Sequence, residues 1–280
     1  NGNNPSHVSP SFTVDLTPPQ ASARVDTEVF SPNGDGNKDS ITLFHETSTE
    51  ESWRGEIRTP EGRVVKSYTW RETADLTSVW DGRRNDGRLA DDGVYVYQLS
   101  ATDRAGNTGT SEPISFELDT GETSVLLSAE YEAFSPNSDG TKDAIRFFPQ
   151  VQRNNDVESY ELRVVPLSVG EAAEGSRQSE ATAESEGAAV RTIAGRGSIN
   201  DAFTWNGFED GGSRAANGQF RARIRVTYRN GNVESAATRS FRLDTRAPQA
   251  RLAADYRLFS PDGDGNRDSI PIEAGSSGEE

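Results

Sequence analysis

The chain has 280 residues, of which 45 are acidic and 29 basic, and its formal net charge at pH 7 is −16. Such a charge argues against nucleic acid and anionic membranes as partners, because both attract basic surfaces. The absence of cysteine excludes disulfides and thiolate metal sites. No apolar run approaches transmembrane length, so we expect no membrane insertion in this segment.

Two internal repeats predict the domain organisation. The motif Phe-Ser-Pro-Asn/Asp-x-Asp-Gly-x-Lys/Arg-Asp begins at Phe30, Phe134 and Phe259. A second motif, Ser-Phe-x-x-Asp, ends at Asp15, Asp119 and Asp244. We therefore expect residues 1–15 to be the C-terminal tail of one repeat, 16–119 and 120–244 to be two whole domains, and 245–280 to be the N-terminal part of a further repeat.

The second predicted domain contains an insert at residues 168–189. This stretch is rich in Gly, Ala, Glu and Ser and cannot bury a core. We expect a loop or disordered hairpin tip, with a short helix as the alternative.

In chain order, residues 22–30 and 40–46 are predicted as the first two strands, and residues 56–58 and 64–70 as a pair around a turn at 59–62. Later strands alternate, with one set of side chains facing inward. About seven short strands per ~100 residues predict an all-β fold of tandem Ig-like or fibronectin-III-like β-sandwich domains. The expected inward side chains are Tyr95, Tyr97, Leu99 and Ala101, and Phe220, Ala222, Ile224 and Val226.

On the opposite face of the later strand lie Arg221, Arg223 and Arg225. We interpret this stripe as an exposed strand face paired with acids such as Glu161 on its neighbour. The alternative is a binding patch.

An enzymatic role is not expected. The two histidines, His7 and His45, lie in different predicted domains and outside the repeated motifs, and we interpret His45 as structural. Trp80 and Trp205 recur at one position of the repeat, which favours packing inside each sandwich over carbohydrate stacking. We assign no catalytic and no cofactor-binding residues.

The acidic loops are candidate calcium sites. Oxygen side chains alternate with small residues, so that a short loop can turn several oxygens toward one hard cation. The alternative is a metal-free loop held by Asx-turns. The candidate ligands are Asn33, Asp35, Asn37 and Asp39; Asn137, Asp139, Thr141 and Asp143; and Asp262, Asp264, Asn266 and Asp268.

The Phe-Ser-Pro-Asn-x-Asp-Gly-x-x-Asp motif, together with Trp-Asp-Gly at Trp80 and Gly-x-Tyr-x-Tyr at Gly93, resembles the Ig-like domain of flagellar hook-capping proteins and of its relatives in large bacterial envelope proteins. The loop is also similar to gliding-motility-associated C-terminal domains of type IX secretion. The resemblance implies an extracytoplasmic protein, located on the cell surface, extracellularly or in the periplasm.

We therefore expect a non-catalytic, calcium-stabilised stalk or scaffold segment of a large bacterial cell-surface or envelope protein, such as an adhesin stalk. Its expected partners are neighbouring repeats of the same chain. The alternative is an adhesive binding module that recognises a glycan or a partner protein through its end loops.

The loop at residues 33–39 should lie at the joint with the next domain. The first and last strands of such a sandwich run in the same direction, and the loop that follows the first strand is therefore at the end where the last strand leaves. Asp86, Asp91 or Asp92 could complete its coordination. Calcium would then stiffen the joint and make the array a semi-rigid rod.

Overall fold

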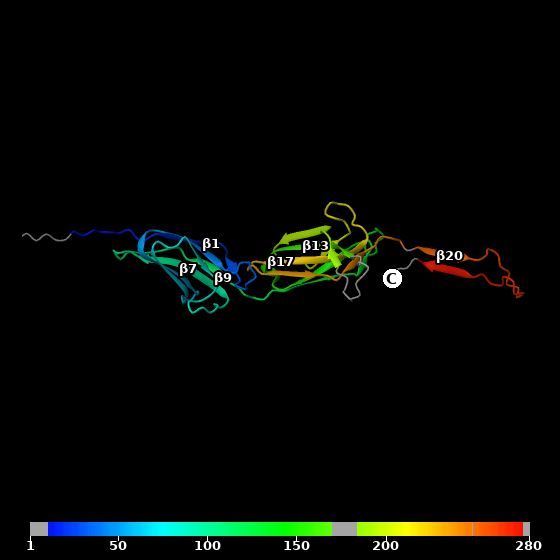
Figure 1. Ribbon diagram of the computed structural model, residues 1–280, viewed down its shortest axis with the longest axis horizontal. Helices are drawn as coiled ribbons and strands as arrows, with labels where there is room; N and C mark the ends of the chain where they lie inside the picture. The colour runs from blue at the N-terminus through cyan, green and yellow to red at the C-terminus, as the bar shows by residue number, and fades with distance from the viewer. Residues whose placement is uncertain (1–10, 170–183, 248, 277–280) are drawn as a thin grey trace, which may run out of the picture.

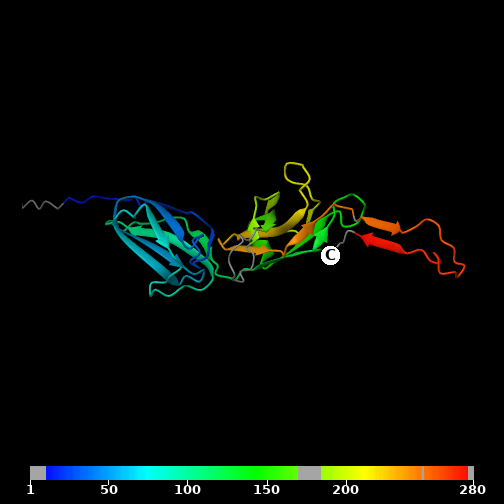
Figure 2. The ribbon, with the colours of Figure 1, turned by 45° about the vertical axis from the view of Figure 1, so that its right-hand side comes forward.

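Figure 1 shows the computed structural model of the chain, which describes residues 11–169, 184–247 and 249–276. Two β-sandwiches lie end to end and a two-stranded hairpin follows them, so that the chain is drawn out along one axis (Figures 1 and 2). Besides strands, the described residues contain one short 3-10 helix, Asn154–Asp156. No helix among them is long and apolar enough to cross a membrane. The fold is all-β, as expected.

The first sandwich packs a three-stranded sheet, with strand order β1-β3-β6, against a larger sheet of order β2-β9-β7-β4-β5, in which β8 also pairs with β7. The larger sheet includes the parallel pair β2–β9, so the first and last strands run in the same direction. The bounds are β1, Ala21–Val25; β2, Val29–Phe30; β3, Ile41–Thr47; β4, Glu50–Arg58; β5, Val64–Glu72; β6, Thr77–Trp80; β7, Gly93–Thr102; β8, Thr108–Thr110; and β9, Ile114–Leu118.

The second sandwich repeats this topology. A sheet of order β10-β12-β16 faces a sheet of order β11-β19-β17-β13-β14, with β15 on β13 and β18 on β17. The bounds are β10, Val125–Ala129; β11, Ala133–Phe134; β12, Ile145–Val151; β13, Val157–Val169; β14, Glu184–Glu186; β15, Arg191–Arg196; β16, Phe203–Trp205; β17, Gly218–Tyr228; β18, Val233–Ala237; and β19, Phe241–Leu243.

A hairpin of β20 (Ala250–Ala254) and β21 (Ile272–Ser276) follows the second sandwich. The strands of the two sandwiches lie within the predicted ranges 16–119 and 120–244. Phe259 of the third motif is 49% exposed, whereas its counterparts Phe30 and Phe134 are buried. Phe12, in the extended segment before the first sandwich, is 84% exposed. Much of the predicted tail at residues 1–15 lies outside the described residues.

Each sandwich has its own aromatic core. Trp80 is fully buried and meets Phe30 and Tyr95 edge to face, at centroid distances of 5.5 and 5.1 Å. Trp205 takes the same place in the second sandwich, where it packs against Phe134 and Phe220. The predicted packing role of the two tryptophans and the predicted inward faces of β7 and β17 are thus confirmed.

The prediction of one first strand at residues 22–30 is wrong, because two strands in different sheets lie there. β1 pairs antiparallel with β3, and β2 pairs parallel with β9. Asp26 lies at the break, where its carboxylate accepts the N–H of Thr42 at 2.9 Å. The last strand is likewise divided into β8 and β9. Alternation continues through a strand that changes sheets, and the sequence pattern therefore does not reveal the break.

Part of the insert is strand, contrary to the prediction of loop or disorder over residues 168–189: residues 168–169 belong to β13 and residues 184–186 form β14, whereas residues 187–189 are irregular as predicted. β13 extends to Val169, and β14 pairs with it in the register Leu167↔Glu186. A polar segment can join a sheet edge because the ladder needs only backbone groups. The rest of the predicted tip, residues 170–183, lies outside the described residues.

Candidate functional site

The first acidic loop is folded around the side chain of Asp39. Its two carboxylate oxygens accept the backbone N–H groups of Gly34 and Gly36, at 2.6 and 2.8 Å. The side-chain oxygen of Asn33 accepts the N–H of Asp35 at 2.9 Å, and a carboxylate oxygen of Asp35 accepts the N–H of Asn37 at 2.7 Å. Three of the four predicted ligands, Asn33, Asp35 and Asp39, therefore hold the loop's own backbone through their side chains, and Asn37 takes part through its N–H.

The other two loops repeat this geometry. Asp143 and Asp268 take the place of Asp39, with N–H···O distances of 2.6–2.8 Å and 2.9 Å. Carboxylate oxygens of Asp262, Asp264 and Asp268 lie within 4.8 Å of one another. Asx-turns account for the shape of all three loops, and a carboxylate oxygen that accepts one N–H keeps a lone pair for a cation.

The first loop lies at the joint between the sandwiches, as predicted. Lys38 donates through Nζ to the carbonyl of Arg229 at 2.7 Å and forms an ion pair with Glu158 at 3.2 Å. Asn33 donates its amide to Asn232 at 2.9 Å. The loop of the first sandwich thus packs on the β17–β18 turn of the second.

The three acids expected to complete the coordination make their contacts elsewhere. Asp91 pairs with Arg84 at 2.6 Å, Asp86 accepts the N–H of Arg88, and Asp92 accepts both the N–H and the hydroxyl of Thr120.

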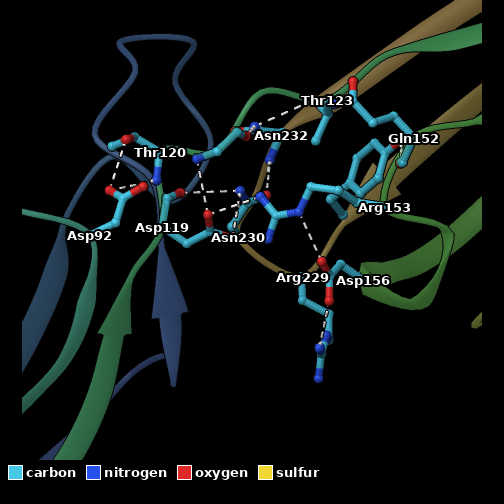
Figure 3. A network of polar contacts seen from close by, with 12 residues as sticks. Asp92, Asp119, Thr120, Thr123, Gln152, Arg153, Asp156, Arg229, Asn230 and Asn232 are labelled. Atoms are coloured by element: carbon cyan, nitrogen blue, oxygen red, sulfur yellow. Dashed lines mark hydrogen bonds and ion pairs between the residues drawn. The ribbon is translucent and has the colours of Figure 1, made fainter.

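The short connection between the sandwiches is clamped by ion pairs (Figure 3). Arg153 forms a two-pronged contact with Asp119, at 2.9 and 2.6 Å between guanidinium nitrogens and carboxylate oxygens. It also contacts Asp156 at 2.9 Å, and Asp156 contacts Arg229 at 3.0 Å. The four side chains form a series of alternating charge, Asp119–Arg153–Asp156–Arg229, which joins the end of the first sandwich to the start of β13 and to the β17–β18 turn of the second.

These contacts keep the carboxylates ionised. Burial opposes ionisation of Asp119, but hydrogen bonds from Arg153 and from the N–H of Gly121 outweigh it and hold the pKa of Asp119 below its usual value. The pKa of Asp156 is lowered chiefly by the hydrogen bond from Arg229, with Arg153 acting in the same direction. The network therefore stays charged at all pH values above the ordinary range of an aspartate.

Two buried amides complete the joint. Asn230 and Asn232 are only 3% and 8% exposed. Asn230 donates to the carbonyl of Asp119 at 3.2 Å, and Asn232 lies 3.4 Å from the carbonyl of Gly121. Buried polar groups that are hydrogen-bonded favour a single arrangement, and these contacts therefore favour one orientation of the second sandwich relative to the first.

The sequence analysis missed the role of residues 229–232 in the joint. A signal was present in the repeat. Asn232 matches Asn107, and Asn107 donates to the carbonyl of Asp15 at 3.1 Å. The same kind of contact therefore recurs at the start of the first sandwich.

The arginine stripe has a different acidic partner from the one predicted. Arg223 and Arg221 lie 2.9 and 3.5 Å from Glu186 of β14, whereas Glu161 pairs with Arg163 of its own strand. Arg225 faces Glu161 across the strand pair in the backbone register. The observed partner differs from the predicted one because Glu186 belongs to β14, a strand that the sequence analysis predicted as loop.

His45 is structural, as expected. Only 3% of its surface is exposed, and its ring nitrogens lie 2.7 Å from the carbonyl of Asp75 and 2.9 Å from the hydroxyl of Tyr97.

No model of a protein family matches the chain. No curated protein matches its sequence.

Several solved structures are similar. The first is a tetra-tandem repeat in the extending region of a large adhesion protein, with 15% identity and a TM-score of 0.35 over 95% of this chain; the chain spans 64% of that structure's length. The second comprises fibronectin(III)-like modules of Clostridium thermocellum CbhA, with 10% identity, a TM-score of 0.39, and coverage of 79% and 94%. The third comes from a 1.5-MDa bacterial ice-binding adhesin, with 14% identity, a TM-score of 0.37, and coverage of 86% of this chain and 70% of that one. Sequence identities and TM-scores this low support no conclusion about the function of this chain.

Proposed function

We propose that this chain is a non-catalytic stalk segment of a large extracytoplasmic protein, in which sandwiches joined end to end act as a semi-rigid spacer. The observation that carries the proposal is the clamp at the joint. β9 ends at Leu118 and β10 begins at Val125, and the few residues between them are bound by Arg153, Asn230 and Asn232. A flexible linker would leave its backbone to solvent, whereas this one is bound on both sides.

The shape supports the same function. The connections of both sandwiches lie at opposite ends of the long axis (Figure 2), so each added repeat lengthens the array. The net charge of −16 favours solubility and discourages lateral association between copies. A spacer must be long, so that it holds a distal part of its protein away from a surface, and it must not aggregate with its neighbours.

The joint can be tested by small-angle X-ray scattering of the whole chain. Arg153→Gln removes the contacts with Asp119 and Asp156 and leaves the partly buried carboxylate of Asp119 without its main partner, whereas Asp156 keeps Arg229. We expect the variant to scatter as a flexible pair of sandwiches, with a broader distribution of interatomic distances than the wild type, and the joint to lose about 1–3 kcal/mol.

Arg146→Gln is the matched control. Arg146 makes an equally short two-pronged contact with Glu130, at 2.9 and 2.6 Å, but within the second sandwich. Its scattering should match the wild type. Two results would contradict the proposal. One is a wild-type scattering curve that fits only a pair of sandwiches joined by a flexible linker; the other is identical scattering curves for Arg153→Gln and the wild type.

We further propose that calcium binds the acidic loops with the weak affinity of extracellular modules, about 10⁻⁴–10⁻³ M. The alternating oxygens of each loop and the three clustered carboxylates of the third support this. Calcium should raise the melting temperature by mass action, and Asp35→Ala with Asp139→Ala should reduce the effect. Identical melting curves in calcium and in EDTA would show that Asx-turns alone hold the loops, and would leave the stalk proposal untouched.

A further inference from the structure

The outer face of the larger sheet of the second sandwich carries a cluster of arginines. β15, β13, β17 and β18 lie side by side in that order. Arg163 stands directly opposite Arg223, and Arg225 stands opposite Glu161. Their neighbours along the strands are buried in the core, so these side chains point outward. Arg196 on β15 extends the same face.

This arrangement is costly for a sheet that has only to fold. Like charges placed directly opposite each other on paired strands destabilise the pair. Glu161 is committed to Arg163, and Arg196 and Arg225 make no ion pair with any residue that the structure describes. Arg223 and Arg221 share a second glutamate, Glu186 of β14. In a chain of net charge −16, this face therefore holds five arginines against two glutamates: Arg163, Arg196, Arg221, Arg223 and Arg225 against Glu161 and Glu186.

The arginines border two hollows. One, of about 450 Å³, is lined by Ala194 and Gly195 on the β15 side; the other, of about 430 Å³, is lined by Ser235 and Ala237 on the β18 side. Both hollows include Glu161 and Arg225 in their lining, and they therefore form one trough across the strands. Four strands spaced by about 4.8 Å make it about 14 Å long.

We propose that this trough, the arginine trough, binds a linear acidic polysaccharide. Guanidinium groups bind carboxylate and sulfate through two parallel hydrogen bonds. The hydroxyl-bearing residues Ser159, Thr227 and Ser235 lie in the same lining and suit the hydroxyl groups of a sugar. The trough crosses the centre of a sheet face, where a peptide cannot pair its backbone with a strand edge as in strand addition.

The occupant is chosen by charge complementarity. The trough is a basic surface on a strongly acidic molecule, so a second copy of this chain brings mostly repulsive charge to it. An acidic polysaccharide instead presents carboxylates at regular intervals along a polar chain. The inference does not rest on the stalk proposal, since a rigid spacer works with or without this surface.

The test is calorimetric titration of the whole chain with polygalacturonate, neutral dextran and poly-L-glutamate. We expect saturable binding of polygalacturonate that weakens as salt is raised, and no binding of dextran. The double variant Arg163→Gln/Arg225→Gln should lose about tenfold or more in affinity, because two charge-assisted contacts are removed.

Arg88→Gln/Arg104→Gln is the control of equal charge change. Both side chains are highly exposed in the first sandwich, at 84% and 88%. This control should bind polygalacturonate as the wild type does. Absence of binding, an equal loss in the control, or equally tight binding of poly-L-glutamate would each overturn the proposal; the last result would assign the trough to acidic polypeptides.

Discussion

Gly231 lies against the first sandwich, next to the backbone of Asn37. A Cβ built on it would be 2.6 Å from the carbonyl oxygen of Asn37, and its φ is +97°. Gly106 holds the same place in the turn of the first sandwich, with φ of +93° and nothing within 4 Å of its Cβ. The two glycines therefore share one backbone requirement, and only Gly231 has the additional contact across the joint.

The first prediction follows from this pair. Gly231→Ala and Gly106→Ala should each destabilise their own sandwich by about 1–3 kcal/mol, because an L-residue is strained at positive φ. Only Gly231→Ala should also push the loop of Asn37 away and change the relative orientation of the sandwiches. Calorimetry measures the first effect, and residual dipolar couplings measure the second. An unchanged orientation in Gly231→Ala would show that the close contact does not set the joint.

His45 should make the first sandwich sensitive to mild acid. Burial is the main influence on its pKa, which lies below the ordinary 6.5 although the Asp75 carbonyl opposes the shift. The neutral ring donates to Asp75 and accepts from the Tyr97 hydroxyl. When the chain unfolds, the histidine regains its ordinary affinity for protons. The stability it contributes is therefore complete above pH 6.5 and is lost as the pH falls through and below that value.

We expect the melting temperature of the first sandwich to fall between about pH 7.5 and pH 5.5. His45→Phe should have a lower melting temperature at pH 7.5, because two hydrogen bonds are lost, and a flatter profile over this window. His7 is present in both proteins and cancels in the comparison. Profiles of equal slope, measured by differential scanning calorimetry, would argue against His45 as the source.

At the scale of the element, the sequence predicted the inward faces of the strands better than the strand ends. The turn after β7 closes with the N–H of Asp103 donating to Asn107, and the turn after β17 closes in the same way between Tyr228 and Asn232. These turns depend on Asn and Gly a few residues apart. The break between β1 and β2 depends on which sheet each half meets, and β14 depends on a free edge of β13. Neither can be recognised from nearby residues.

The loops show a similar division. Their closed shape follows from local spacing, since each terminal aspartate accepts two N–H groups from the glycine-containing stretch before it. The position of the first loop at the joint followed from strand direction, and the contacts of Lys38 confirm it. The expected contribution of Asp86, Asp91 or Asp92 to calcium binding stays a prediction; in the structure these acids contact Arg88, Arg84 and Thr120, respectively.

At the scale of the molecule, the two separate cores lead to a mechanical prediction. Force applied to the chain ends should unfold the sandwiches in separate steps, because no residue belongs to both hydrophobic clusters. The extended chains of residues 16–119 and 120–244 are roughly 36 and 44 nm long at about 3.5 Å per residue, and each step should be shorter than this by the end-to-end length of the folded sandwich. Single-molecule force spectroscopy measures both steps. One step that releases the whole length, or two equal steps, would contradict the prediction.

The sequence by itself determined the all-β class, the inward faces of the strands, the packing role of the tryptophans and the place of the first loop at the joint. All of these depend on periodicity, turn residues and the spacing of a repeat, which are properties of the chain order. Only the tertiary structure decided that Arg153 would clamp Asp119, that Glu186 rather than Glu161 would meet Arg223, and that Arg163 would stand opposite Arg223. The physical reason is that these contacts join separate elements, and their partners are set by sheet register and by the stacking of one sandwich on the next.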